Sequence, residues 1–300
     1  MENVMLTPYV DPRKFGIRNR DDVSSAITQL HAQINKWCDD QGYLGLTAHS
    51  ILVNKLMYYT EKEVQKKNEK FKIDTGWYLY GPCYENGRTY ELEESPISIV
   101  RESEEVSDEV SAVCQELVPL YYKYYKKGHM SVKRDFLRDI YTKKCDHKEL
   151  SEYYPAKHDL QCQLWDFDYG NPEFDGTEYD RISRVITQFD RVLIRGKYPE
   201  FVGLKNEEIY ELLEFTPVFE EYVRLAAEGS GSRPLFEALK STADVVLKAL
   251  AHLNYARTFE AASVTHTKNV RSTHKQTACK NLKLLPEENH RLLDAYRPTT

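Results

Sequence analysis

Apolar residues recur at three- and four-residue steps along most of this chain, and that spacing is typical of one buried face of an α-helix. The first such stripe consists of Val23, Ile27, Leu30, Ile34 and Trp37. Asp21 or Asp22 can cap this helix at its start, and Gly42 and Gly45 can end it. Thr47 can cap a second helix, which is apolar from Ile51 to Tyr59 and then turns polar.

The pattern changes after the second helix. The stretch FKIDTGWYLY, residues 71–80, is rich in residues that favour β-strands. We expect GPCY, residues 81–84, to turn, and the Asn-Gly pair at 86–87 to close a hairpin, because both of its residues tolerate positive φ. Thr89–Leu92 is then the return strand. The sequence therefore predicts a two-stranded β-wing near residues 71–92, docked on the helix that starts near residue 47.

Helical spacing resumes after Ser107, which can cap a helix that Pro119 bends or restarts. A basic helix follows from Ser131, and a long amphipathic helix runs from about Pro234 to Ala262. We therefore expect a mainly α protein with a small two-stranded β-wing, a winged-helix-like N-terminal domain and a helical C-terminal half. The predicted divisions are a helical domain with the hairpin wing at 1–145, a helical middle region at 146–228, and a C-terminal helix with a basic arm at 234–300.

The composition is ordinary for a folded protein. The chain has 300 residues, of which 41% are hydrophobic and 29% charged, so it can bury a core. No run approaches the roughly 18 consecutive apolar residues of a membrane span, and the start lacks the apolar centre of a signal peptide. We therefore expect a cytoplasmic protein with no membrane partner. The six cysteines have no framework spacing, which favours free thiols over disulfides.

One segment resembles a known family. Residues 51–84 read ILVNKLMYYTEKEVQKKNEKFKIDTGWYLYGPCY. A helix with K-L-x-Y-Y, a polar stretch and a strand ending in W-x-x-Y-G-P resembles the Panacea-type domains of antitoxin and phage-associated proteins, and related uncharacterised archaeal proteins. The matching positions are Lys55, Leu56, Tyr58, Tyr59, Trp77, Tyr80, Gly81 and Pro82. The resemblance implies a small helical domain with a β-wing that neutralises or presents a partner protein.

This chain departs from the family pattern after the Y-G-P motif. The sequence CYENGRTYELEE follows here, whereas the relatives have a small residue and the start of an aliphatic helix. The helix that would open the second half of the family domain is therefore displaced or absent.

The aromatic strand allows two interpretations. Alternation places Trp77 and Leu79 on one face of the strand and Tyr78 and Tyr80 on the other, so both faces need cover. The rings are either core between helices or a patch that contacts a partner, since Tyr and Trp are favoured interface anchors. The candidate partner-binding residues are Trp77, Tyr78, Tyr80, Pro82 and Tyr84.

Charge is distributed unevenly. The net charge of −6 gives no overall attraction to nucleic acid. Between Thr265 and Lys283, however, there are five basic residues and no acidic one. The candidate nucleic-acid-binding residues in this segment are Lys268, Arg271, Lys275 and Lys280. Binding through them would weaken steeply with salt. A mobile arm that binds nothing, or that binds an acidic partner, is the alternative.

Evidence for a metal or a catalytic centre is weak. Cys145, His147, His158 and Cys162 are ligand types that zinc accepts. The single residue between Cys145 and His147 is a tighter gap than zinc sites normally have, so we assign no metal and no cofactor and leave zinc binding open. The chain has no Gly-rich phosphate loop, no G-x-S-x-G and no H-E-x-x-H motif. No residue is identified as catalytic.

The sequence thus favours a non-enzymatic protein-interaction module that resembles antitoxin or phage-associated partner proteins and uses the Trp77–Tyr84 region and its flanking helices for contact. The alternative is a winged-helix-like nucleic-acid-binding protein, with the hairpin turn at Glu85–Arg88 and the basic segment on phosphate.

Overall fold

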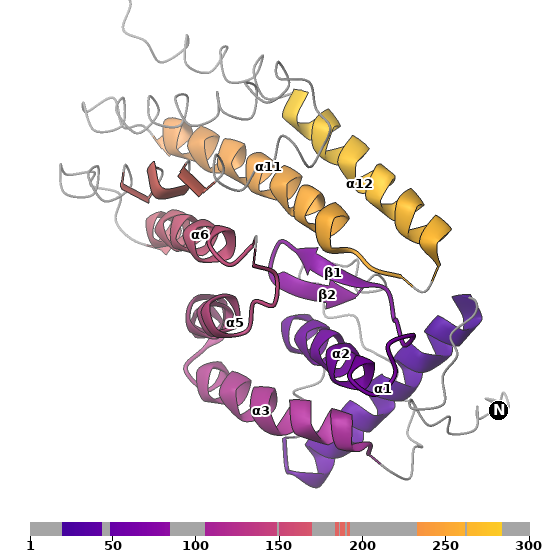
Figure 1. Cartoon of the computed structure of the whole chain (residues 1–300). Coiled ribbons are helices and arrows are strands. Elements are labelled where there is room, and N and C mark those ends of the chain that lie inside the picture. The colour runs from indigo at the N-terminus through magenta and orange to yellow at the C-terminus, as the bar shows by residue number, and fades with distance from the viewer. Residues whose placement is uncertain are drawn as a thin grey trace, which may run out of the picture. The chain divides into compact units, whose positions relative to one another are not determined.

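The chain folds into a mainly helical protein with a small two-stranded antiparallel sheet, as the hydrophobic pattern predicts (Figure 1). The computed structural model describes residues 20–43, 49–84, 106–148, 150–169, 233–261 and 263–283, and scattered positions between 184 and 192. Two compact units are present: Met1–Leu137 with Thr258–Arg271, and Arg138–Arg257 with Ser272–Thr300.

The predicted divisions at 1–145, 146–228 and 234–300 stay a prediction. Residues 258–271 belong to the first unit together with residues 1–137. Within that unit the backbone of Glu260 pairs with that of Thr75, a contact that the spacing of apolar residues does not reveal.

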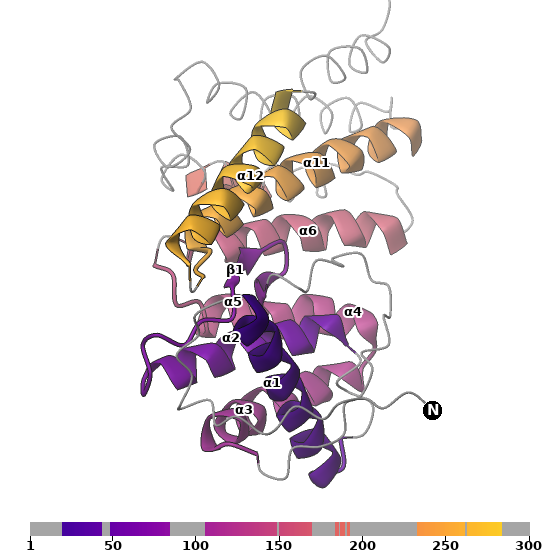
Figure 2. The same ribbon diagram turned by 90° about the vertical axis from the view of Figure 1, so that its right-hand side faces the viewer.

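Three helices of the first unit contact one another (Figure 2). They are α1 (Arg20–Asp40), α2 (Ser50–Gln65) and α3 (Asp108–Tyr125). The predicted stripe of α1 is confirmed where it is described, because Ile27, Leu30, Ile34 and Trp37 are buried. Burial of each such side chain contributes roughly 1.5–3 kcal/mol. Gly42 follows α1 at a φ of 77°, a left-handed conformation that suits glycine at a helix end.

Helix α2 lies at the centre of the first unit. It contacts α1, α3 and the sheet, and its residues from Ile51 to Tyr58 are buried all round. The predicted burial of its first half is therefore confirmed. His49 occupies the N-cap position without a side-chain hydrogen bond. The predicted cap, Thr47, lies outside the described residues.

The sheet pairs β1 (Thr75–Tyr78) with β2 (Gly81–Tyr84), in the register Thr75 to Tyr84 and Tyr78 to Gly81. The prediction of a strand and hairpin beside α2 is confirmed, but GPCY is wrong as a turn, because it is the strand that pairs with β1. Gly81 explains the difference, because its φ of 85° supplies the left-handed residue that closes a tight turn at Leu79–Tyr80. The predicted return strand, Thr89–Leu92, and the Asn-Gly pair at 86–87 lie outside the described residues.

Helix α3 begins as predicted and continues through Pro119 to Tyr125. The Ser107 hydroxyl caps it by accepting a hydrogen bond from the backbone N–H of Val110, at 3.3 Å. Pro119 lies inside the helix and does not restart it. Proline removes one backbone hydrogen bond, and because Pro119 is exposed the freed carbonyl lies on the solvent side.

Short helical segments follow α3. Gly128, at a φ of 107°, precedes α4 (His129–Ser131), the π-helical turn η4 (Val132–Phe136) and α5 (Leu137–Lys143). A basic helix starting at Ser131 is therefore only approximately right, because the region is divided into three pieces with a π-helical turn at its centre.

The second unit has an aromatic core of its own. Helix α6 (Tyr153–Tyr169) contributes Tyr154 and Lys157, both buried. The Lys157 ammonium lies 5.5 Å from the centre of the Tyr141 ring and 5.8 Å from that of Tyr154, so the rings compensate part of its lost hydration.

Two long helices complete the described chain. Helix α11 (Arg233–Thr258) ends at Thr258 rather than at Ala262, because the residues that follow pair with β1. The predicted basic arm is also a helix, α12 (Val264–Lys283). Its start is capped by Ser263, whose hydroxyl accepts from the backbone N–H of His266 at 3.3 Å.

Candidate functional site

One face of α2 carries polar side chains although it lies against the hairpin. Asn54, Tyr58, Glu61 and Gln65 are spaced by three or four residues and therefore share that face. Asn54, Tyr58 and Glu61 are buried and Gln65 is half-buried. Buried polar groups are stable only when they are hydrogen-bonded, so the partners of this face decide its role.

Asn54 and Tyr58, in the first half of this face, each accept one hydrogen bond from the hairpin. The Asn54 side-chain oxygen accepts from the backbone N–H of Tyr84 at 3.3 Å. The Tyr58 hydroxyl accepts from the indole N–H of Trp77 at 3.0 Å, and the two rings meet edge to face. The fully buried indole is thus satisfied inside the core.

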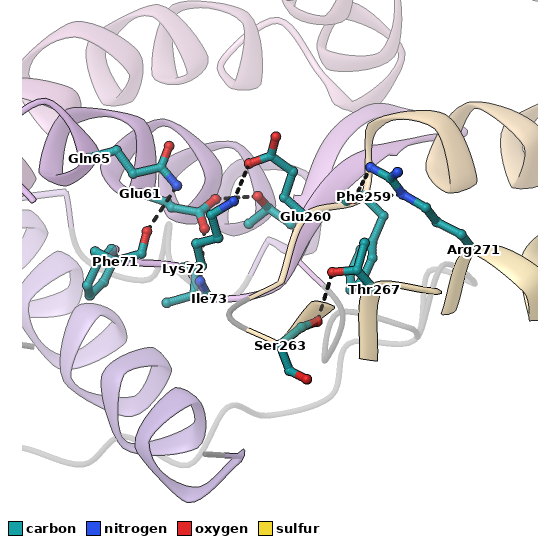
Figure 3. A network of polar contacts seen from close by, with 11 residues as sticks. Glu61, Gln65, Phe71, Lys72, Ile73, Phe259, Glu260, Ser263, Thr267 and Arg271 are labelled. Carbon is teal, nitrogen blue, oxygen red and sulfur yellow. Dashed lines mark hydrogen bonds and ion pairs between the residues drawn. The ribbon is translucent and has the colours of Figure 1, made fainter. Parts of the chain in front are cut away.

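The second half of the face holds the strand that leads into β1 (Figure 3). One Glu61 carboxyl oxygen accepts from the backbone N–H of Ile73 at 2.9 Å, and the other accepts from the Thr75 hydroxyl. The Gln65 amide donates to the carbonyl of Phe71 at 2.9 Å. A single helix face therefore fixes the hairpin from Phe71 to Tyr84.

Lys55 closes the turn of the hairpin from the same helix. Its ammonium donates to the carbonyl of Tyr80, and to that of Pro82 at 3.0 Å. Pro82 has no N–H to offer on this outer edge of β2, so the edge presents acceptors that a lysine can satisfy. The side chain is fully buried, and this burial lowers the pKa of the Lys55 amine to about 7.

The other edge of the sheet is covered by the segment that follows α11. The backbone N–H of Thr75 donates to the carbonyl of Glu260 at 3.2 Å, and the N–H of Glu260 donates to the carbonyl of Thr75 at 3.0 Å. The N–H of Trp77 donates to the Thr258 hydroxyl at 2.7 Å. Both edges of the two-stranded sheet are thus paired or capped.

Side chains reinforce this second edge (Figure 3). The Lys72 ammonium lies 2.9 Å from a Glu260 carboxylate oxygen, and the Arg271 guanidinium donates to the carbonyl of Phe259 at 2.8 and 3.1 Å. His266 approaches the Asp74 carboxylate to 3.2 Å. Asp74 adopts a φ of 61°, a left-handed conformation that Asp tolerates better than most residues.

Glu61 has an unusual environment for a carboxylate. Burial raises the pKa of its carboxyl to about 7, while the hydrogen bonds from Thr75 and Ile73 and the charge of Lys62 act in the opposite direction. Lys55 and Glu61 are therefore two buried ionisable groups whose described hydrogen bonds join α2 to the hairpin. The arrangement is suited to holding a strand in place.

The five predicted partner-binding residues are mostly inside this core. Trp77, Tyr78, Pro82 and Tyr84 are buried, and Tyr80 is half-buried at the turn. The Tyr84 hydroxyl lies 3.0 Å from Nε2 of His31. Core packing therefore accounts for the four buried residues, and contact with a partner stays a prediction for which Tyr80 offers the accessible side chain.

The four predicted nucleic-acid-binding residues lie on α12. Lys268 and Lys280 are exposed, and Arg271 and Lys275 are half-buried. Lys268 and Arg271 belong to the first unit, whereas Lys275 and Lys280 belong to the second. Because Arg271 also binds the Phe259 carbonyl, it has a structural role that the charge pattern does not indicate.

The cysteine and histidine residues form two separate local pairs. The Cys145 thiol donates to the carbonyl of His147 at 3.4 Å, and the Cys162 sulfur lies 3.6 Å from Nε2 of His158. Among the described residues, no three His, Cys, Asp or Glu side chains come together as metal ligands.

The hairpin anchors were not identified from the sequence. Asn54, Glu61 and Gln65 are polar residues at helical spacing on a mostly apolar helix, and that spacing was the available signal. It indicates a polar stripe, but it does not say that strand backbone covers it.

A scan against protein-family models and searches of curated proteins and of solved structures found no match to this chain. In the part of the chain that the structure describes, no helix combines the length and the apolar composition that a membrane crossing needs.

The first prediction concerns Lys55. Replacement by Met keeps much of the side-chain volume but removes the hydrogen bonds to the carbonyls of Tyr80 and Pro82. An unsatisfied buried carbonyl costs roughly 1–3 kcal/mol, so we expect Lys55→Met to lower the free energy of unfolding by about 2–4 kcal/mol at pH 9. Urea denaturation measures this change. The exposed Lys70→Met is the control and should change stability by less than about 0.5 kcal/mol.

The effect of Lys55→Met should also depend on pH. The pKa of the amine is lower in the folded than in the unfolded protein, so between about pH 7 and pH 10.5 the folded protein binds fewer protons. The contribution of Lys55 to the free energy of unfolding of the wild type therefore rises with pH through this window. The Met variant has no such contribution. The loss should be smaller at pH 6 than at pH 9. Equal losses would contradict a lowered pKa.

A second prediction concerns Glu61→Gln. The carboxyl pKa is raised from 4.5 to about 7, so the folded protein binds more protons than the unfolded protein between these values. Stability contributed by Glu61 is present below pH 4.5 and is lost as pH rises towards 7. The stability of wild type relative to Glu61→Gln should therefore fall by on the order of 2–3 kcal/mol across this window. Chemical denaturation at a series of pH values tests it, and a constant difference would refute it.

Proposed function

We propose that this chain is a non-enzymatic protein-interaction module of the kind that its resemblance to antitoxin and phage-associated domains implies. One observation carries the proposal: residues at the motif positions contact one another. Lys55 donates to the carbonyls of Tyr80 and Pro82, and Tyr58 accepts from Trp77. The K-L-x-Y-Y and W-x-x-Y-G-P motifs therefore act as one folding unit, which is what a shared domain core requires.

The accessible part of this unit is its turn. Leu79 and Tyr80 are half-buried, whereas the residues of both strands are buried. The backbone of Tyr80 is fixed because its carbonyl accepts from Lys55. A partly exposed aromatic side chain on a fixed backbone loses little conformational entropy on binding, which favours its use as an interface anchor.

The product of a gene adjacent to the one that encodes this chain is the partner to test. The two proteins are co-expressed, and their stoichiometry is measured by size-exclusion chromatography with light scattering. We expect a 1:1 complex whose Kd increases about tenfold or more in Tyr80→Ala, with an unchanged Tm, because the Lys55 bond uses the backbone. Tyr43→Ala, at a half-buried tyrosine that follows α1, should bind as wild type does.

Two results would count against the proposal. One is that neither of the two neighbouring gene products binds the folded full-length chain. The other is binding that Tyr80→Ala and Tyr43→Ala weaken equally, which would place the contact elsewhere.

A second candidate function is binding of duplex DNA through α12. The supporting observation is that α12 exposes Lys268 and Lys280 in a helix without acidic residues. We expect wild type to be retained on DNA cellulose in low salt, and Lys268→Ala with Lys280→Ala to elute at lower salt, because each lost phosphate contact weakens binding. Arg271 is left intact in this test because it binds the Phe259 carbonyl. Unchanged elution would exclude α12 as the contact.

A further inference from the structure

The end of α3 carries aromatic and basic side chains that take no part in the described hydrogen bonds between α2 and the hairpin. Between Leu117 and Arg134 the chain has five basic residues and no acidic one, in a protein of net charge −6. We call the α3-end surface the side chains of Tyr122, Lys123, Tyr124, Tyr125, Lys126 and Lys127. All six are exposed or half-buried, and Tyr125 is 40% exposed.

Cations and rings alternate on this surface. The Lys126 ammonium lies 4.3 Å from the centre of the Tyr122 ring. The ammonium groups of Lys123 and Lys127 lie 5.2 and 5.7 Å from the centre of the Tyr124 ring. Exposed cation–π contacts of this kind are worth little and rearrange easily. Each ring face can therefore receive another flat group while the lysine moves to an anion beside it.

Two of the rings, Tyr122 and Tyr125, pack on other aromatic side chains of the first unit. Tyr125 stacks on Tyr121 at 6.0 Å with an interplanar angle of 18°, and it also packs on His49 at 4.8 Å. Tyr43 meets the edge of the Tyr122 ring at 5.1 Å. The Tyr121 ring is buried. The buried Tyr121 and the half-buried His49 and Tyr43 thus fix the orientation of the Tyr125 and Tyr122 rings, as in a preformed stacking platform.

Basic side chains that follow α3 in the chain add to the positive charge of this surface. The π-helical turn η4 holds Lys133 and Arg134, both half-buried. Such turns are rare and occur frequently at functional sites. Asp135, in the same turn, is an exposed carboxylate that accepts from the Ser131 hydroxyl at 2.6 Å. At the end of α1, Asp40 pairs with Lys36 at 3.6 Å.

Interaction with the helix dipole explains only part of this pattern. Lysines in the last turn of a helix are favourable because they lie near its partial negative charge. That effect accounts for Lys123 and for the lysines just after the helix. It gives no reason for three tyrosines among them, since an exposed aromatic ring gains nothing from a helix dipole.

We propose that the α3-end surface binds single-stranded nucleic acid, with bases on the tyrosine rings and phosphates on the lysines. Single-strand binding combines positive charge along the backbone with aromatic side chains on which bases stack. An acidic peptide would match the charge but has no group that requires the rings. This site differs from α12 and from the hairpin turn, so the proposal does not depend on either function given above.

Fluorescence anisotropy with labelled oligothymidylate of 12 nucleotides, titrated with the full chain at several salt concentrations, tests the proposal. We expect Tyr124→Ala to raise Kd by about fivefold or more, because stacking on the ring is lost, and Tyr124→Phe to bind nearly as wild type does. Lys126→Ala with Lys127→Ala should lower the slope of log K against log salt by about 1.4, which is 0.7 for each single-strand phosphate contact.

The charge-matched control is Lys70→Ala with Lys148→Ala, at two exposed lysines outside every proposed binding surface, which should leave oligothymidylate binding unchanged. Thermal melting of every variant checks that it is folded. Equal competition by polyglutamate, with no difference between Tyr124→Ala and Tyr124→Phe, would assign the surface to acidic peptides and overturn the proposal. Absence of oligothymidylate binding by the folded wild type would also overturn it.

Discussion

The hydrogen bonds between the polar face of α2 and the hairpin backbone are the constraint on which the first unit depends. A two-stranded sheet is marginally stable alone, and its edges carry unpaired backbone groups that must find partners once buried. Lys55 and Asn54 satisfy one edge, and residues 258–260 satisfy the other. Leaving a buried acceptor or donor without a partner costs more free energy than a typical hydrogen bond contributes to stability. These hydrogen bonds therefore act mainly by disfavouring positions of the hairpin in which its buried backbone groups are unpaired.

The covering of the second edge explains why the first unit is discontinuous in sequence. Thr258 and Glu260 reach β1 across about 180 residues, as in the bond from the Trp77 N–H to the Thr258 hydroxyl at a separation of 181. The entropy of closing such a loop grows only slowly with its length, so a long insertion is tolerated in the native state. Contacts of this separation form late and slow folding, however, and until they form the edge of β1 is unpaired.

The sequence predicted the features that depend on local periodicity. It did not predict the features that depend on contacts between residues far apart in the chain. The stripe of α1 and the Ser107 cap are local, since helical spacing and a cap residue are sufficient to specify them. The GPCY strand was predicted as a turn because the Asn-Gly pair at 86–87 is a strong turn signal, whereas Gly81 closes the turn first. The pairing of Thr75 with Glu260 leaves no local trace. Glu61 and Lys55 were visible as polar residues in an apolar helix, but their burial is a tertiary property.

The residues that hold α2 to the hairpin are distinct from the accessible residues of the first unit. Lys55, Tyr58 and Trp77 are almost fully buried, so they specify the core and restrict its variation. Binding residues are disproportionately found on loops and helix ends that a rigid scaffold positions, and a shared fold does not by itself imply a shared ligand. The Tyr80 turn and the α3-end surface are such positions, and both lie in the first unit. Substitutions at the Tyr80 turn or on the α3-end surface can therefore change what these surfaces contact without disturbing the bonds of α2 to the hairpin.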